Sequence, residues 1–301
     1  MKHTLKVTIS LVLFFFMAQF VGLLVINYYI DHKKTVETKA VAWQPLPYNL
    51  ERPELKNQSA SFIYITIAIL IGTILVLLLI KFNKAFIWKF WFFVTVWLTL
   101  SIAFATFLNN IVAAVIALII SVLKLYKPNM ITQNLSEIFI YGGLAAIFVP
   151  IINLFAAFML LIIISVYDFI AVFKTKHMIK LAKFQSKSKV FAGLLIPYER
   201  RKISIGGKQP SASKSKEKKS RVAVLGGGDI GFTLIFAGVV MKGLMLQETM
   251  LIGFLKTLII PSFVSLALLI LLLKGAKDKF YPAMPFLSLG CFMGYLVVLA
   301  I

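Results

Sequence analysis

The sequence is poor in the residues from which disulfides and metal centres are built. Cys291 is the one cysteine among 301 residues, which excludes an internal disulfide and a cysteine metal cluster. The three histidines, His3, His32 and His177, are scattered along the chain and show no metal-ligand spacing. We therefore expect neither a metal nor another cofactor.

Acidic residues are also scarce, with 11 Asp and Glu against 32 Lys and Arg, which gives a net charge of +21. Such a charge on a soluble protein would suggest nucleic-acid binding. However, 60% of the residues are hydrophobic and the mean hydropathy is +0.92, values that exclude an ordinary soluble domain. Lysine collects in the cytoplasmic loops of membrane proteins, so the expected partner is the lipid bilayer and not nucleic acid.

The hydrophobic runs are long enough to span a membrane and predict an all-α, polytopic membrane protein with nine transmembrane helices. The expected spans are 5–30, 60–80, 87–107, 111–126, 137–149, 152–173, 221–241, 251–273 and 284–301. The eighth span contains Pro261, where we expect a kink. The lysine-rich connectors all fall on one side, which predicts a cytoplasmic N-terminus and an extracytoplasmic C-terminus in the cell membrane.

The connector over residues 174–220 divides the chain into a six-helix part, 1–173, and a three-helix part, 221–301. It is rich in lysine and arginine, and its low-complexity portion predicts a disordered cytoplasmic loop. Two interpretations stay open for this loop. It is either an electrostatic tether to anionic lipid or a solvated connector.

Two acidic residues, Asp168 and Asp229, fall well within predicted spans, whereas the other acids lie in loops or near span ends. An acid inside the membrane is expensive and indicates a functional site. Both lie toward the cytoplasmic ends of consecutive antiparallel spans, so their carboxyls should lie at similar depth. Two facing carboxyls can share one proton, and such a pair can activate water while protonating a peptide carbonyl.

Three glycines, Gly226, Gly227 and Gly228, precede Asp229. They would allow another helix or a substrate backbone to approach closely, although small residues are also ordinary at helix contacts in membranes. With Gly231 they match the letters of a dinucleotide-binding fingerprint. The following residues lack the polar helix face and the βαβ unit of that fold, so we reject this interpretation.

A proline-bracketed segment, Pro282, Ala283 and Met284, precedes the last span. Because proline resists helix and lacks an N–H group, we expect an extended segment with free carbonyls. Such a segment could bind an unwound substrate by strand addition, or it could be no more than a helix entry turn.

At these residues the chain resembles the presenilin and signal-peptide-peptidase family of intramembrane aspartyl proteases. Tyr167-Asp168 matches the family's Tyr-Asp, the glycines with Asp229 match its Gly-x-Gly-Asp, and the Pro282 segment matches Pro-Ala-Leu with methionine for leucine. The run that begins at Tyr167 is most similar to the archaeal homologues of presenilin.

The resemblance implies that Asp168 and Asp229 are the catalytic pair and that the Pro282–Met284 segment shapes the site. Tyr167 either forms a hydrogen bond near the pair or merely packs. The implied substrates are single transmembrane helices cut within the membrane. The sequence indicates no obligate subunit and leaves homo-oligomers open. Two other functions are a proton- or ion-coupled transporter that uses the same pair, and a non-catalytic scaffold.

Overall fold

The computed structural model describes residues 4–53, 55, 57–82, 84–174, 184, 190–197, 222–275 and 281–301. The longer helices are α1 (Leu5–Tyr29), α2 (His32–Thr38), α3 (Ser61–Lys81), α4 (Ala85–Phe104), α5 (Asn110–Tyr126), α6 (Met130–Phe148), α7 (Leu154–Phe173), α9 (Gly227–Leu244), α10 (Met250–Thr257), α11 (Ile259–Lys274) and α12 (Met284–Ala300). Three 3₁₀ turns cover Pro47–Asn49, Gln58–Ala60 and Val149–Ile151, and the strands are β1 (Gly193–Pro197) and β2 (Val222–Gly226). The described chain is thus mostly helical, with one small sheet.

Seven helical segments of the described chain are long and apolar enough to cross a membrane. They contain α1, α3, α4, α6, α7, α9, and α10 together with α11, and two shorter apolar helices, α5 and α12, accompany them. Length and composition therefore account for seven candidate spans. The expected nine crossings and the orientation of the chain stay predictions.

The helices differ in how much of their surface the protein covers. Helices α1, α6, α7, α9, α11 and α12 pack against one another and form the main core, whereas α3 buries only Ser61. Lipid tails are as apolar as leucine side chains, so peripheral membrane helices can expose apolar residues. The close packing of α6 on α4 depends on Gly143, where a Cβ atom would lie 1.9 Å from the carbonyl oxygen of Thr99.

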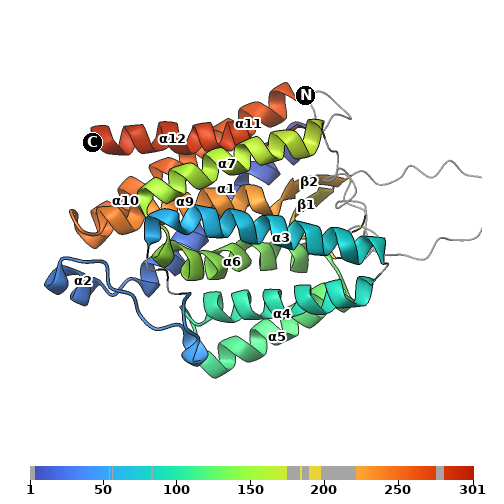
Figure 1. Ribbon diagram of the computed structural model, residues 1–301, viewed down its shortest axis with the longest axis horizontal. Coiled ribbons are helices and arrows are strands. Elements are labelled where there is room, and N and C mark those ends of the chain that lie inside the picture. The colour runs from blue at the N-terminus through green and yellow to red at the C-terminus, as the bar shows by residue number, and fades with distance from the viewer. Residues whose placement is uncertain are drawn as a thin grey trace, which may run out of the picture.

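The small sheet lies at one end of the helix bundle, where α9 begins, whereas the C-terminus lies at the opposite end (Figure 1). Strands β1 and β2 are antiparallel, with Gly193 opposite Gly226 and Pro197 opposite Val222. The expectation that the helix begins at residue 221 is therefore wrong. The β-branched Val222 and Val224 favour a strand, and the glycines that follow disfavour helix.

Strand β1 also corrects the expectation of a disordered connector over 174–220, because residues 193–197 are ordered as a strand. The rest of that connector lies outside the described residues, apart from the few positions that flank β1 and Phe184. The division of the chain into parts 1–173, 174–220 and 221–301 stays a prediction.

Two helix boundaries differ from the expected ones. Helix α6 begins at Met130 instead of near residue 137, because the side chain of Asn129 caps it and its first turns bury polar side chains that have partners. The expected eighth span is broken into α10 and α11 at Leu258, close before Pro261. Proline cannot donate a hydrogen bond to the carbonyl four residues earlier, so a break at that point is the physical consequence.

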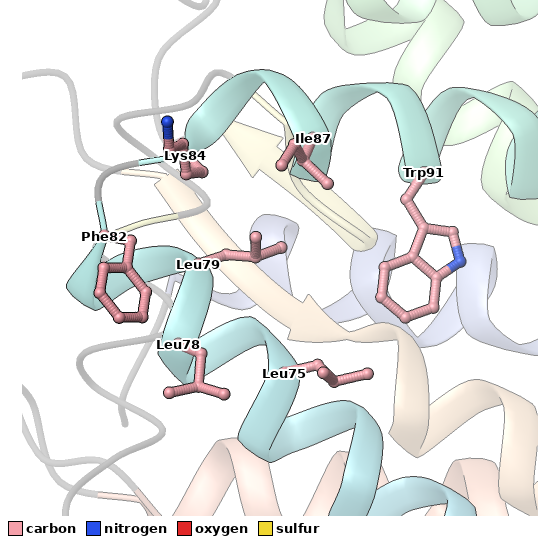
Figure 2. Close-up of a pocket in the computed structure, with 7 residues that line it drawn as sticks. All are labelled: Leu75, Leu78, Leu79, Phe82, Lys84, Ile87 and Trp91. Carbon is pink, nitrogen blue, oxygen red and sulfur yellow. The ribbon is translucent and has the colours of Figure 1, made fainter.

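A hollow of about 320 Å³ lies between the end of α3 and the start of α4 (Figure 2). Its walls are almost wholly apolar and include Leu75, Leu78 and Leu79 of α3 with Ile87 and Trp91 of α4. No residue of α7 or α9 lines it, so this hollow is separate from the two aspartates.

Candidate active site

Asp168 is buried near the C-terminal end of α7, with 7% of its surface exposed. Its Oδ2 atom accepts a hydrogen bond of 3.1 Å from the backbone N–H of Met284, and the backbone of Ala283 donates to the same carboxyl. These donors belong to the start of α12, where N–H groups lack partners within the helix. The Asp168 side chain therefore caps α12, a position where the helix dipole favours a negative charge.

Asp229 is the third residue of α9 and is partly buried. The backbone of Gly226, the last residue of β2, forms a hydrogen bond with its carboxyl. The side chain of Thr233 donates to the Asp229 carbonyl oxygen at 2.8 Å, within the first turns of the helix. Asp229 therefore also lies at a helix N-terminus, directly after the sheet.

The structure brings the two aspartates together. Helices α7 and α9 pack against each other, and the Asp168 carboxyl is close enough to that of Asp229 for the two to interact electrostatically. Within the described part of the chain, neither carboxyl forms an ion pair with a basic side chain. Two carboxyls that interact in a low dielectric resist ionising together, so one can act as an acid while the other acts as a base.

The predicted glycines have three different surroundings. A Cβ atom on Gly226 would lie 3.4 Å from Oδ2 of Asp229, and one on Gly227 would lie 2.5 Å from the hydroxyl oxygen of Tyr141. Gly228 is exposed, and its nearest neighbour would be Phe232 at 3.6 Å. Close approach is therefore essential at Gly227, whereas Gly228 borders open space beside the aspartate.

The proline-bracketed segment contacts Asp168 through N–H groups and not through free carbonyls. Ala283 has helical backbone angles, with φ −84° and ψ −35°, and its carbonyl accepts from the N–H groups of Phe286 and Leu287. The expectation of an extended strand with free carbonyls is wrong at Ala283, because the chain already turns there into α12.

Tyr167 lies on α7 next to Asp168, and its hydroxyl lies 3.3 Å from the Thr73 hydroxyl of α3. This contact connects the helix that carries Asp168 to α3, which buries little of its surface. It leaves the expected role of Tyr167 beside the pair as a prediction.

A third acid, which was not predicted from the sequence, lies within the apolar helices. Glu137 is 1% exposed in α6 and forms an ion pair with Lys124 of α5, which is also buried. The hydroxyl of Tyr141 and the amide of Gln133 donate to the same carboxylate. The spacing of four residues places Gln133, Glu137 and Tyr141 on one helix face, but the sequence alone does not indicate that this face is buried.

One edge of the sheet is covered by α6. The Asn134 side chain donates to the Leu195 carbonyl at 2.8 Å and accepts from the Leu195 N–H at 2.9 Å, as a neighbouring strand would. Val224 of β2 lies opposite Leu195, so its own N–H and carbonyl point away from β1. Val224 is 51% exposed, and no strand of the described chain pairs with that edge.

Comparisons with known proteins support these observations. A family model described as signal-peptide peptidase, presenilin aspartyl protease, matches residues 46–301. Two solved structures of a presenilin family intramembrane aspartate protease, in C222 and P2 space groups, each have a TM-score of 0.59 and 19% identity to this chain. They cover 97% of this chain, which in turn covers 98% and 96% of theirs, so the overall fold is shared. No curated protein sequence matches.

Proposed function

The chain belongs to the signal-peptide-peptidase and presenilin family of aspartyl proteases, and on that basis we propose that Asp168 and Asp229 together hydrolyse peptide bonds within transmembrane helices. The protein is an aspartic endopeptidase and an integral membrane protein. One observation carries the proposal for these two residues. They are acids on two packed helices that are each long and apolar enough to cross a membrane, and their carboxyls interact electrostatically.

In the proposed mechanism the pair itself supplies the chemistry. One carboxylate accepts a proton from water, and the water oxygen attacks the peptide carbonyl carbon while the protonated carboxyl donates to the carbonyl oxygen. Collapse of the tetrahedral intermediate breaks the C–N bond, and the pair returns a proton to the leaving amine. The backbone N–H of Met284 holds Asp168 in place, and the backbone of Gly226 holds Asp229.

The free edge of β2 is the surface that we propose for the substrate. A peptide bond in a helix must be unwound before water can attack it, and unwinding exposes backbone groups that cost several kcal/mol each in lipid. Val224 offers an N–H and a carbonyl to such a strand, and β2 leads directly into the helix that carries Asp229. Strand addition there would satisfy the substrate backbone beside the catalytic pair.

Purified protein and a reporter fused to a single-span helix test the proposal. Asp168→Asn and Asp229→Asn keep the side-chain volume but remove the acid, and each should abolish cleavage. Asp31→Asn, at the cap of the short α2, is the matched control and should cleave like the wild type. Product from either variant of the pair would refute the assignment. Proton flux in liposomes, lost in the same variants, would instead support the transporter.

A further inference from the structure

A buried polar cluster lies between α5, α6 and the catalytic region. It consists of Lys124, Gln133, Glu137 and Tyr141, and we call it the Glu137 cluster. Glu137 is 1% exposed, Lys124 3% and Tyr141 4%. A buried ion pair is weak evidence for stability, because its desolvation offsets its attraction. Ionisable residues buried between apolar helices are rare and generally functional, so the cluster requires an explanation.

The Glu137 carboxylate is held on both oxygens. Its Oε1 atom accepts from the Lys124 ammonium and, at 3.0 Å, from the Gln133 amide, whereas Oε2 accepts from the Tyr141 hydroxyl. Lys124 is held further by the Ser136 hydroxyl at 3.0 Å. The phenol of Tyr141 therefore has a fixed position, because its hydrogen is committed to a carboxylate that is itself fixed.

The Tyr141 ring lies against the start of α9. A Cβ atom on Gly227 would come within 2.5 Å of the phenol oxygen, and one on Gly231 would lie 3.6 Å from the ring. The phenol is also close enough to interact electrostatically with Asp229. The backbone that carries the Asp229 carboxyl thus rests on a side chain that the cluster holds in place.

The cluster also reaches the sheet. The amide nitrogen of Gln133 lies 2.9 Å from the carbonyl oxygens of Phe191 and Gly193, at the start of β1. Next to them, the Gly227 N–H donates to the Ala192 carbonyl at 3.2 Å. One carboxylate, that of Glu137, is therefore linked through Tyr141 to the start of α9 and through Gln133 to β1.

We propose that Tyr141 is a positioning residue for Asp229, and that the Glu137 cluster sets the distance between Asp229 and the sheet. The inference rests on the proposed function, since it assumes that Asp229 reacts and that the substrate pairs with β2. A strand on β2 is placed in register by the sheet, and the carboxyl then selects the bond to be cut. The cluster would accordingly determine both the rate of cleavage and its position along the substrate.

The test compares the wild type with Tyr141→Phe, which keeps the ring and removes the hydroxyl that Glu137 accepts from. A misplacement of about 1 Å can reduce a rate by roughly a hundredfold, so we expect kcat to fall at least about tenfold while KM stays within about twofold. Mass spectrometry of the products should show cuts at additional positions. Tyr29→Phe is the matched control, because that buried hydroxyl donates to the Ile102 carbonyl at 2.9 Å. It should leave kcat and the cut positions unchanged.

Gln133→Met provides an independent test if Tyr141→Phe fails to fold. It removes the link to Phe191 and Gly193 but leaves the ion pair intact, so it should redistribute the cuts among neighbouring bonds. A Tyr141→Phe protein with wild-type kcat and wild-type cut positions would overturn the proposal. If Tyr141→Phe does not fold, the same result in Gln133→Met would overturn it. Asp229→Asn, assayed in parallel, distinguishes failure of the proposed function from failure of the positioning role. Cleavage by that variant would refute the proposed function, whereas its inactivity beside an unaffected Tyr141→Phe would refute only the positioning role.

Discussion

Gly227 is the position where one added methyl group should disturb the active site most directly. The Cβ atom of Gly227→Ala would lie 2.5 Å from the Tyr141 phenol oxygen, whereas ordinary contact begins at 3.4 Å. Either the ring or the start of α9 must therefore move by about 0.9 Å. The ring cannot move freely because its hydroxyl donates to Glu137, and such a bond to a charged group contributes about 1.5–3 kcal/mol.

These opposing effects can be weighed. Overpacking a core costs about 1–3 kcal/mol, and alanine improves a helix over glycine by at most about 1 kcal/mol. The net expectation for Gly227→Ala is a free energy of unfolding lower by about 1–2 kcal/mol. Moving the start of α9 also moves Asp229, so activity should fall by roughly a hundredfold.

Gly228→Ala is the matched control for the fold. Its added Cβ would meet only Phe232, at 3.6 Å, so thermal stability should be unchanged or slightly higher. Any loss of activity in Gly228→Ala would then indicate that cleavage needs the open space beside Asp229. Thermal unfolding in detergent and reporter cleavage measure both variants.

The double variant Gly227→Ala with Tyr141→Phe tests whether the contact with the Tyr141 hydroxyl causes these effects. Removing the hydroxyl lengthens the shortest contact from 2.5 to 3.2 Å, the distance to Cε1 of the ring. The two changes should therefore be non-additive, with stability in the double variant higher than the sum of the single effects predicts. A Gly227→Ala protein as stable and as active as the wild type would show that the reasoning from this contact is wrong.

Two further predictions concern backbone groups at helix ends. Met284→Leu should retain activity within a few-fold, because Asp168 accepts from the backbone N–H of residue 284 and not from its side chain; a loss beyond about a hundredfold in the cleavage assay would contradict that account. Lys242→Met should lower the free energy of unfolding by about 1–3 kcal/mol, since the Lys242 ammonium donates to the carbonyls of Val149 and Ile152. Its loss removes a donor from the buried Ile152 carbonyl, whereas the Val149 carbonyl keeps the Ile152 N–H. Thermal unfolding measures the second change, and the exposed Lys81→Met should have no such effect.

The sequence predicted the elements whose signal is local. Long apolar runs predicted the membrane helices, and α1, α3 and α7 differ from expectation by only a few residues at their ends. The two aspartates could be chosen because each is an isolated charge in an apolar run. Their motifs also indicated the family that the comparisons confirm.

The sheet and the Glu137 cluster could not be predicted in the same way, because they depend on partners distant in the chain. Val222–Gly226 is a strand because Gly193–Pro197 lies beside it, and nothing local in the apolar run indicates that partner. Glu137 and Lys124 lie at the ends of their predicted spans, where charges are ordinary. Their burial became evident only once α5 and α6 were packed together.

The sheet depends on the buried polar side chains of α6. Irregular backbone among membrane helices is tolerated only where protein or a water-filled cavity satisfies its polar groups. At the start of β1, the Gln133 and Asn134 side chains supply those partners from α6. The break in helical structure before Gly227 is thereby made stable, and it leaves the edge of β2 open beside Asp229. A continuous helix through residues 221–241 would need no such partners, but it would offer the substrate no backbone to pair with. The buried polar residues of α6 are therefore a condition for the proposed strand addition and not an incidental feature of the core.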